Sequence, residues 1–457
     1  MMLHAPIPHN LDGSLMLALC NRLWSDRSGN FGIITAILAV PLTGAAGLAI
    51  DLTHALSLRT QLYAAADAAA VGAISPKAPA VIEAMAMGGD GSITVGSPDG
   101  QNLFLGQMAG ELKDMPVEVQ VTVTKTGGVI ESHVSFSAVM PTTFMRVLGR
   151  ESVNIGGAAT ARYQTPAFMD FYMLLDNTPS MGVGATPADV AKLVDATRAG
   201  TDGKGKDAKC AFACHIVSTA GVEDKNSYFY LAKAIGATIR IDVVAEATAA
   251  LMRTAETTQT VPGQFRMAAY TFGETALDTK LFTVSEPTID FRAISKATKA
   301  ITLMSIPSHE YPNNQTNYDA VLNAINTKIV TVGSGSSTAD RQSILFFVAD
   351  GVGDAVKPTC SRRFQNGKRC MEPIDPAKCK ILKDRGIKIA ILYTSYLPLK
   401  DNSFYMDWIW PFQNDIPRHM EACASPGYYF EVSLDQGISD AMNALFHKIV
   451  STPRITS

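Results

Sequence analysis

The chain has 457 residues, 47% of them hydrophobic, and this length predicts two or three structural units rather than one. Its 39 Lys and Arg against 42 Asp and Glu give a formal net charge of −3, and no strongly basic block is present. This balance argues against a nucleic-acid-binding protein. The sequence contains no low-complexity tract of the kind that indicates a long disordered segment.

An uncharged run at residues 31–50 is the first element along the chain. As a helix it would be about 30 Å long, which matches the hydrocarbon core of a bilayer. The apolar part of a cleaved signal peptide is usually shorter, about 7–15 residues. We therefore expect a transmembrane helix at residues 31–50, rather than a signal peptide or a buried globular helix. Arg22 and Arg27 precede the span and favour a cytoplasmic tail at residues 1–30.

Two further regions follow the span. Residues 51–75 include an alanine-rich stretch at 64–70, and alanine has the highest helix propensity, so a helical stalk is expected. Residues 76–165 contain alternating apolar and polar residues at 117–123 and at 134–138, the pattern of half-buried strands. We interpret residues 76–165 as a small β-rich module; its residues do not indicate its function.

Strand and helix patterns alternate from residue 166 to residue 452. Apolar runs at 171–175, 344–348 and 387–393 are typical of strands buried on both faces, and residues 240–257, 318–329 and 434–450 have helical patterns. The pattern predicts an α/β domain with a doubly wound, mostly parallel sheet. Such sheets bind ligands at the carboxyl ends of their strands.

Oxygen-bearing side chains occur at two of these strand ends and at one helix start. Asp176, Thr178 and Ser180 follow the first buried strand, and Asp350 follows the strand at 344–348. Thr316 precedes the helix at 318–329. Each alone is an ordinary turn or helix cap, but together they offer the oxygen ligands that a hard divalent cation prefers.

This arrangement resembles the metal-ion-dependent adhesion site of von Willebrand factor A (vWA) domains. The resemblance implies that Thr178, which replaces the usual Ser, and Ser180 bind the metal directly. It implies that Thr316 binds directly or through water, and that Asp176 and Asp350 act mainly through waters. Mg²⁺ is the expected ion, with Mn²⁺ or Ca²⁺ as alternatives, and a protein partner is expected to supply an acidic residue to the open position.

The N-terminal region resembles the TadE/TadG-like proteins of Tad (Flp) pilus assembly, through the segments at 28–31 and 59–70 that flank the span. Large members of this group carry a vWA domain after such an anchor. The resemblance implies a single-pass protein of the inner membrane with most of its chain in the periplasm. Pilin-like members carry a Glu early in the span for proteolytic processing, and residues 31–50 contain none, so a retained anchor is expected.

The cysteines are divided by the span, since Cys20 precedes it and six others follow it. An even number on one side favours three disulfides in an oxidising compartment, with a zinc cluster as the weaker alternative. Sequence proximity pairs Cys210 with Cys214 and Cys360 with Cys370. Cys379 and Cys423 fall on helices that precede two successive strands, so we pair them as well, although six cysteines allow 15 connectivities.

The leading functional hypothesis is a non-enzymatic, membrane-anchored binding and assembly protein of a pilus or secretion system. One alternative is a surface adhesin or another membrane vWA protein with no pilus role. Another is a metal-dependent hydrolase with Asp176 as nucleophile, but haloacid-dehalogenase-like phosphatases carry a second Asp at the position of Thr178.

Overall fold

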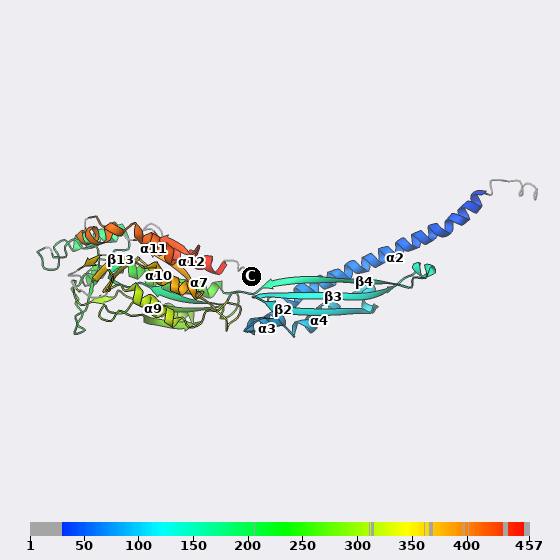
Figure 1. Cartoon of the computed structure of the whole chain (residues 1–457), viewed down its shortest axis with the longest axis horizontal. Coiled ribbons are helices and arrows are strands. Elements are labelled where there is room, and N and C mark those ends of the chain that lie inside the picture. Colours follow the sequence, from blue (N-terminus) through cyan, green and yellow to red (C-terminus); the bar gives the residue numbers. More distant parts are fainter. Residues whose placement is uncertain are drawn as a thin grey trace, which may run out of the picture. The chain divides into compact units, whose positions relative to one another are not determined.

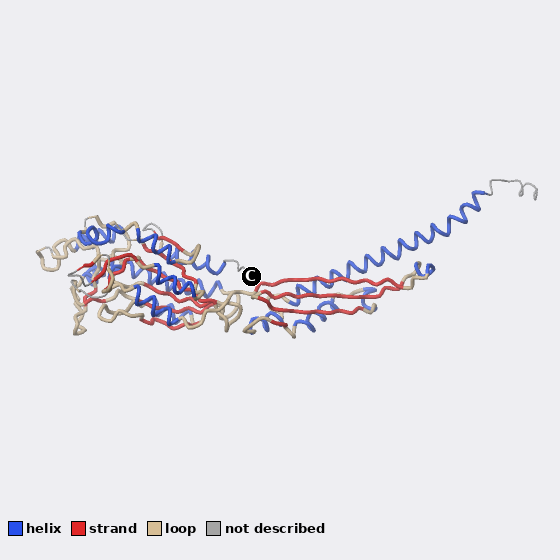
Figure 2. The backbone as a smooth tube through the Cα atoms, viewed as in Figure 1, coloured by secondary structure: helices blue, strands red, loops and turns tan. Residues whose placement is uncertain are grey.

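The computed structural model describes residues 30–204, 206–309, 311, 315–360, 362–364, 369–395, 398–400, 402–432 and 437–451 (Figures 1 and 2). The predicted tail at residues 1–30 lies outside this part of the chain except for Asn30. The chain forms two compact units. The anchor unit comprises residues up to 80 with 92–124 and 131–163, and the C-terminal unit comprises 81–91, 125–130 and everything from 164.

One continuous helix, α2 (Asn30–Ala73), begins the anchor unit. Its apolar part is long and hydrophobic enough to cross a membrane. Residues 32–43 are exposed, whereas from Asp51 onward a stripe at helical spacing is buried, including Ala55, Leu58 and Leu62. The span and the stalk expected from the sequence are therefore one helix with two environments.

A four-stranded sheet in the order β1-β2-β3-β4 follows α2 with several short helices, and most of α3 and the β2–β3 turn belong to the C-terminal unit. The long strands β2 and β3 are joined by a two-residue turn at Gly127 and Gly128, whose φ angles of 57° and 84° suit a hairpin loop. The bounds are β1 Gly91–Ser92, β2 Val117–Thr126, β3 Val129–Pro141, β4 Ser152–Gln164, α3 Pro79–Ala86, α4 Gly96–Gly106, η2 Gly110–Asp114 and η3 Met145–Leu148.

The sequence predicted the long strands of this region but not its helices α3 and α4. The start of α4 carries Gly96 and Gly100, which lower helix propensity. A Cβ atom at Gly96 would lie 2.6 Å from Val123, and one at Gly100 would lie 2.7 Å from Val121. These glycines let α4 pack closely against β2, a tertiary effect that a local pattern does not reveal.

The C-terminal unit is built on a six-stranded sheet in the order β15-β14-β10-β5-β7-β8. The first five strands of this order pair in parallel, and β8 pairs antiparallel to β7. The predicted α/β class is confirmed, with a mixed sheet. The bounds are β5 Met169–Leu175, β7 Phe265–Thr271, β8 Phe282–Thr288, β10 Gln342–Ala349, β14 Lys388–Thr394 and β15 Tyr429–Val432.

Helices cover both faces of this sheet (Figures 1 and 2). Alternate residues of each strand enter two separate cores: Leu174 and Phe347 pack with α9, α10 and α11, whereas Phe171 and Phe346 pack with α7, α8 and α12. The bounds are α5 Pro187–Ala196, α6 Tyr228–Ala234, α7 Arg240–Thr258, α8 Phe291–Lys299, α9 Tyr318–Lys328, α10 Pro376–Asp384, α11 Asp415–Cys423 and α12 Ile438–Ser451.

Short elements fill two long insertions, one between Ser180 and α7 and one between Asp350 and α10. The second insertion is more regular than a surface loop, because it forms a three-stranded sheet in the order β11-β13-β12. The bounds are β6 His215–Ile216, β9 Ser305–Ile306, β11 Val352–Ala355, β12 Arg363–Phe364, β13 Arg369–Pro373, η4 Pro179–Gly182, η5 Tyr405–Ile409 and η6 Trp410–Phe412.

Two disulfides join the pairs predicted from the sequence, Cys360–Cys370 and Cys379–Cys423. The second links α10 to α11, the helices that precede the neighbouring strands β14 and β15. The predicted pair Cys210–Cys214 is wrong for this structure, since both thiols are free. The backbones of Ala211 and Ala213 hydrogen-bond to the 182–184 segment, and the Cys210 thiol donates to the Phe212 carbonyl.

The two disulfides should differ in their effect on stability. Replacing Cys379 and Cys423 together with Ala should lower the free energy of unfolding by about 4 kcal/mol, and replacing Cys360 and Cys370 by about 3 kcal/mol. The reason is the size of the loop that each bond closes, with sequence separations of 44 and 10. Urea unfolding of the two double variants would measure this, and the opposite order would contradict it.

Candidate metal-binding site

The loop after β5 gathers three of the predicted site residues. Asp176 continues the ladder to β10, because its backbone N–H donates to the Val348 carbonyl at 2.9 Å. The Thr178 backbone N–H and hydroxyl both donate to Asp176 Oδ1, at 2.9 and 2.7 Å. The Thr178 and Ser180 hydroxyl oxygens are 3.3 Å apart. Asp176, Thr178 and Ser180 therefore form one oxygen-rich cluster.

Asp350 reaches this cluster from the neighbouring strand. It follows β10, whose Val348 pairs in register with Leu175 of β5, so the two strands end side by side. The Tyr318 hydroxyl donates to Asp176 Oδ2 at 3.0 Å and lies 3.5 Å from Asp350 Oδ1. The Gly351 backbone N–H donates to the same hydroxyl at 3.1 Å. One tyrosine thus bridges the two carboxylates.

Thr316 lies at the edge of this cluster. It is 3% exposed, and its backbone pairs with Asp354 through hydrogen bonds of 2.8 and 2.9 Å. This pairing joins the start of α9 to β11, the strand that follows Asp350. Thr316 and Ser180 line the same cavity. The structure therefore brings four predicted residues into contact around Tyr318 and places the fifth beside them.

Burial gives the two carboxylates unusual electrostatics. Burial first, and repulsion from Asp350 second, raise the pKa of Asp176 to about 7, against the hydrogen bonds from Thr178 and Tyr318. Burial also raises the pKa of Asp350, although the Arg240 guanidinium opposes the rise. Within the described residues, Asp350 Oδ2 is buried without a hydrogen-bond partner. A cation bound beside these two buried carboxylates would be stabilised by their charge and would give the unpaired Oδ2 atom a partner.

The chemistry of the site suits a divalent metal. The donor atoms are carboxylate and hydroxyl oxygens, the ligands that Mg²⁺, Mn²⁺ and Ca²⁺ accept. An ion would neutralise the repulsion between Asp176 and Asp350 and satisfy the buried Oδ2 atom. The residues present fit a hard divalent cation.

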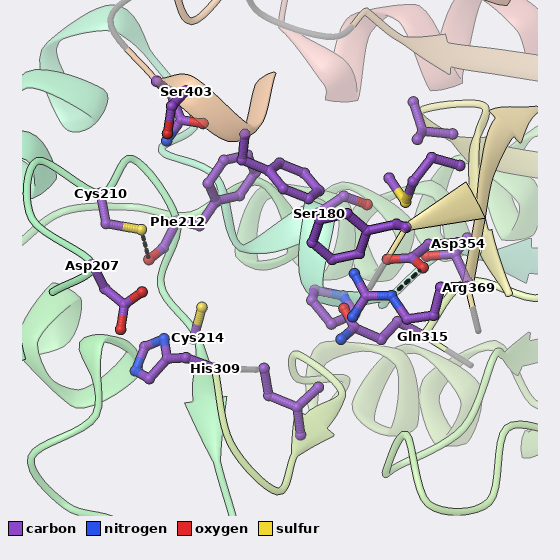
Figure 3. A pocket seen from close by; sticks show the side chains of 18 of the residues that line it. Ser180, Asp207, Cys210, Phe212, Cys214, His309, Gln315, Asp354, Arg369 and Ser403 are labelled. Carbon is purple, nitrogen blue, oxygen red and sulfur yellow. Dashed lines mark hydrogen bonds and ion pairs between the residues drawn. The ribbon is translucent and has the colours of Figure 1, made fainter. Parts of the chain in front are cut away.

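A cavity of about 410 Å³ opens beside the cluster (Figure 3). One side carries Cys210, Phe212 and Cys214 from the first insertion, and the other carries Asp354 and Arg369 from the second. The two insertions thus form opposite walls of the cavity that Ser180 and Thr316 line.

A buried ion pair shapes the second wall. Arg369 Nε lies 2.7 Å from Asp354 Oδ1, and Arg369 Nη1 donates to the Tyr311 carbonyl at 2.6 Å. Burial raises the pKa of Asp354 to about 6, and Arg369 opposes this rise. The pair holds β11 to β13 beside Thr316.

Tyr318, Arg240 and the Asp354–Arg369 pair were not predicted from the sequence. Tyr318 stands two residues after Thr316, where its apolar ring looked like an ordinary core residue of α9. Its function as a bridge depends on a contact 142 residues away along the chain. No spacing pattern could have identified these residues.

The zinc alternative gains no support from the part of the chain that the structure describes. Within the described residues, one group of three or more His, Cys, Asp or Glu side chains has its ligand atoms within 4.8 Å of one another. It consists of Cys360, Cys370 and Glu372. The two cysteines are disulfide-bonded, so they offer no thiolates.

Comparison with known families identifies the N-terminal region. Residues 29–86 match the family described as putative Flp pilus-assembly TadE/G-like. The N-terminal segment is TadE/G-like. The match confirms the resemblance predicted from the sequence and covers α2 and α3. It covers less than half of the chain and does not include the candidate site. No curated protein matches the sequence.

Solved structures similar to the chain include two pilus proteins. The vWF domain of the type V pili tip protein Mfa5 from Porphyromonas gingivalis is 9% identical, with a TM-score of 0.35, over 64% of this chain and 99% of that domain. The pilus adhesin SpaC from Lactobacillus rhamnosus GG is 11% identical, with a TM-score of 0.33, over 75% of this chain and 35% of SpaC. Scores this low assign neither a fold nor a function.

Proposed function

We propose that this chain is a membrane-anchored binding protein of a Tad pilus or a related secretion system. In this proposal the C-terminal unit is a vWA-type domain that binds one divalent cation, Mg²⁺ by default. The TadE/G-like segment supports the pilus context. The observation that carries the binding role is the pair of buried carboxylates, Asp176 and Asp350, at the carboxyl ends of two adjacent parallel strands.

The residues of the site have separate tasks in this proposal. Thr178 and Ser180 would ligate the ion through their hydroxyls, and Asp176 and Asp350 would hold its waters. Tyr318 keeps the two carboxylates at a fixed separation through its hydrogen bond to Asp176. Bound, the ion would supply a positive centre that attracts a carboxylate of a partner protein. The cavity beside Ser180 and Thr316 gives that partner room to approach.

Binding is the proposed activity rather than catalysis. An aspartyl nucleophile at Asp176 would need an exposed carboxylate that is ionised and free to attack. Asp176 is fully buried, its Oδ1 accepts two hydrogen bonds from Thr178, and its Oδ2 accepts one from Tyr318. Its oxygens are positioned to hold a cation or its waters.

The proposed topology has α2 in the inner membrane, the N-terminus in the cytoplasm and both units in the periplasm. The two disulfides support this, since such bonds persist in oxidising compartments. An alkaline phosphatase fused after Ser457 should be active, because that enzyme matures only outside the cytoplasm. Activity from a cytoplasm-only reporter at the same position would contradict this topology.

The pilus role can be tested in the source bacterium by complementing a gene deletion. Wild type should restore Flp pili, and Asp350→Asn should not, because it halves the negative charge available to the cation. The control is Asp189→Asn, which changes another buried aspartate. Its carboxylate accepts a hydrogen bond from the Thr186 hydroxyl, and Thr186 caps α5 by accepting one from the Asp189 backbone N–H. Full piliation with Asp350→Asn, at wild-type protein levels, would refute the role of the site.

A further inference from the structure

The connection between β3 and β4 carries an exposed apolar tip. We call residues 142–150 the tip loop. Val147 is 88% exposed, Leu148 63% and Phe144 46%, the first two within the short helix η3. Arg146 and Arg150 flank these side chains and are also exposed. Such a group of apolar side chains with basic neighbours is typical of an interaction surface.

The tip loop is fixed to α2 at one particular level of that helix. The Asp51 carboxylate accepts hydrogen bonds from the backbone N–H groups of Thr143, Phe144 and Met145, at 3.2, 2.8 and 2.6 Å. One turn earlier, Gly47 packs so closely that an added Cβ would lie 2.5 Å from Phe144 Cβ. The position of the loop along α2 is therefore well defined.

That level is the end of the apolar span. Asp51 is the first charged residue after the uncharged run at residues 31–50. A charged side chain at the end of a span is stable at the membrane–water boundary and costly in the hydrocarbon core. Because Asp51 binds the loop backbone directly, the tip loop lies at the same boundary if α2 crosses the membrane.

We propose that the tip loop inserts Val147 and Leu148 into the surface of the lipid bilayer that α2 spans. Burying these exposed side chains removes apolar area from water. Arg146 and Arg150 can extend toward lipid phosphates while their aliphatic parts stay near the apolar boundary. The anchor unit then contacts the bilayer at two points, the span and the loop. This inference rests on the proposed anchor.

The loop is held in shape by its own hydrogen bonds. The Thr142 hydroxyl donates to the Arg150 carbonyl, and the Arg150 backbone N–H donates to the Met145 carbonyl at 3.1 Å. Gly149 adopts a φ of 79°, which a side chain would disfavour. Val147 and Leu148 are therefore presented by an ordered turn.

Site-specific fluorescence in lipid vesicles can test this proposal. The full-length chain carries Ser in place of Cys20, Cys210 and Cys214, so that single cysteines can be labelled with nitrobenzoxadiazole. The three labelled variants are Val147→Cys in the tip loop, Leu38→Cys in the span and Leu105→Cys on α4. Vesicles of phosphatidylcholine and phosphatidylglycerol contain lipids with a nitroxide on the acyl chain, and iodide serves as the aqueous quencher.

Leu105 is a matched exposed control, 52% exposed on the same unit. Leu103, two residues before Leu105, contacts α2 at Gly72, where an added Cβ would lie 2.9 Å from its side chain. Gly72 is about 32 Å along α2 from Asp51, so this part of α4 is equally far from the level of the tip loop. Labels at 38 and 147 should lose fluorescence to the lipid nitroxide, shift to shorter wavelength and resist iodide. The label at 105 should be quenched by iodide alone.

Three results would overturn the inference, each differently. A label at 147 that behaves like the one at 105, with 38 quenched by lipid, leaves the anchor intact and refutes loop insertion. A label at 147 that resists both quenchers means that protein covers the loop. If the label at 38 also escapes the lipid quencher, the proposed membrane anchor itself is wrong.

Discussion

Asp176→Asn should weaken Mg²⁺ binding by about 10- to 100-fold, the loss typical of residues that hold a metal through an outer shell. The amide keeps an oxygen that can accept the hydrogen bonds from Thr178, so the loop after β5 should retain its conformation. Calorimetric titration of the purified chain with MgCl₂ measures the effect.

The same variant should not lose stability in the absence of metal at pH 8. Asn removes the repulsion between two buried carboxylates, so metal-free Asp176→Asn should unfold at the same temperature as wild type or higher. Asp189→Asn provides the control and should keep wild-type affinity for Mg²⁺. Unchanged affinity in Asp176→Asn, or a variant that fails to fold, would count against the proposed metal site.

The stability of the metal-free protein should fall as pH rises from about 4 to about 7. The pKa of Asp176 is 3.8 in an unfolded chain and about 7 in the folded protein, so the folded state holds an extra proton within this range. Stability therefore decreases as pH rises through this range. The difference in thermal unfolding between wild type and Asp176→Asn measures the contribution of the coupled pair Asp176 and Asp350, apart from other titrating groups.

Mg²⁺ should reverse this pH dependence. The ion competes with the proton for the carboxylates, so it should raise the unfolding temperature of wild type at pH 8 and have little effect at pH 5. Equal stabilisation at both pH values would contradict binding at Asp176 and Asp350. Stabilisation of Asp176→Asn equal to that of wild type would place the ion elsewhere.

The parts of the site that the sequence predicted follow from one geometric rule. Parallel strands end at the same edge of a sheet, so Asp176 after β5 and Asp350 after β10 had to lie close together once those strands were neighbours. The continuous apolar runs of β5, β10 and β14 made the strands themselves easy to recognise. The Cys379–Cys423 bond follows from the same parallel order, since the two helices lead into adjacent strands.

The features that the sequence did not predict depend on tertiary contacts. Gly96 and Gly100 look like helix breakers until β2 lies against them. Tyr318 looks like a core residue until its hydroxyl meets Asp176. The pairing of Cys210 with Cys214 used sequence proximity alone, and both thiols are free in the structure.

The position of β5 has a mechanical consequence. The chain leaves β4 at Gln164 and enters β5 at Met169, between β10 and β7 in the sheet, and Asp176 lies at the other end of the same strand. Under the proposed function, a partner held at the cation site and pulled away from the membrane would load β5 along its length. Load that enters at Asp176 passes along the covalent backbone of β5, whereas load that enters through Asp350, after β10, would shear the hydrogen bonds between β10 and β5.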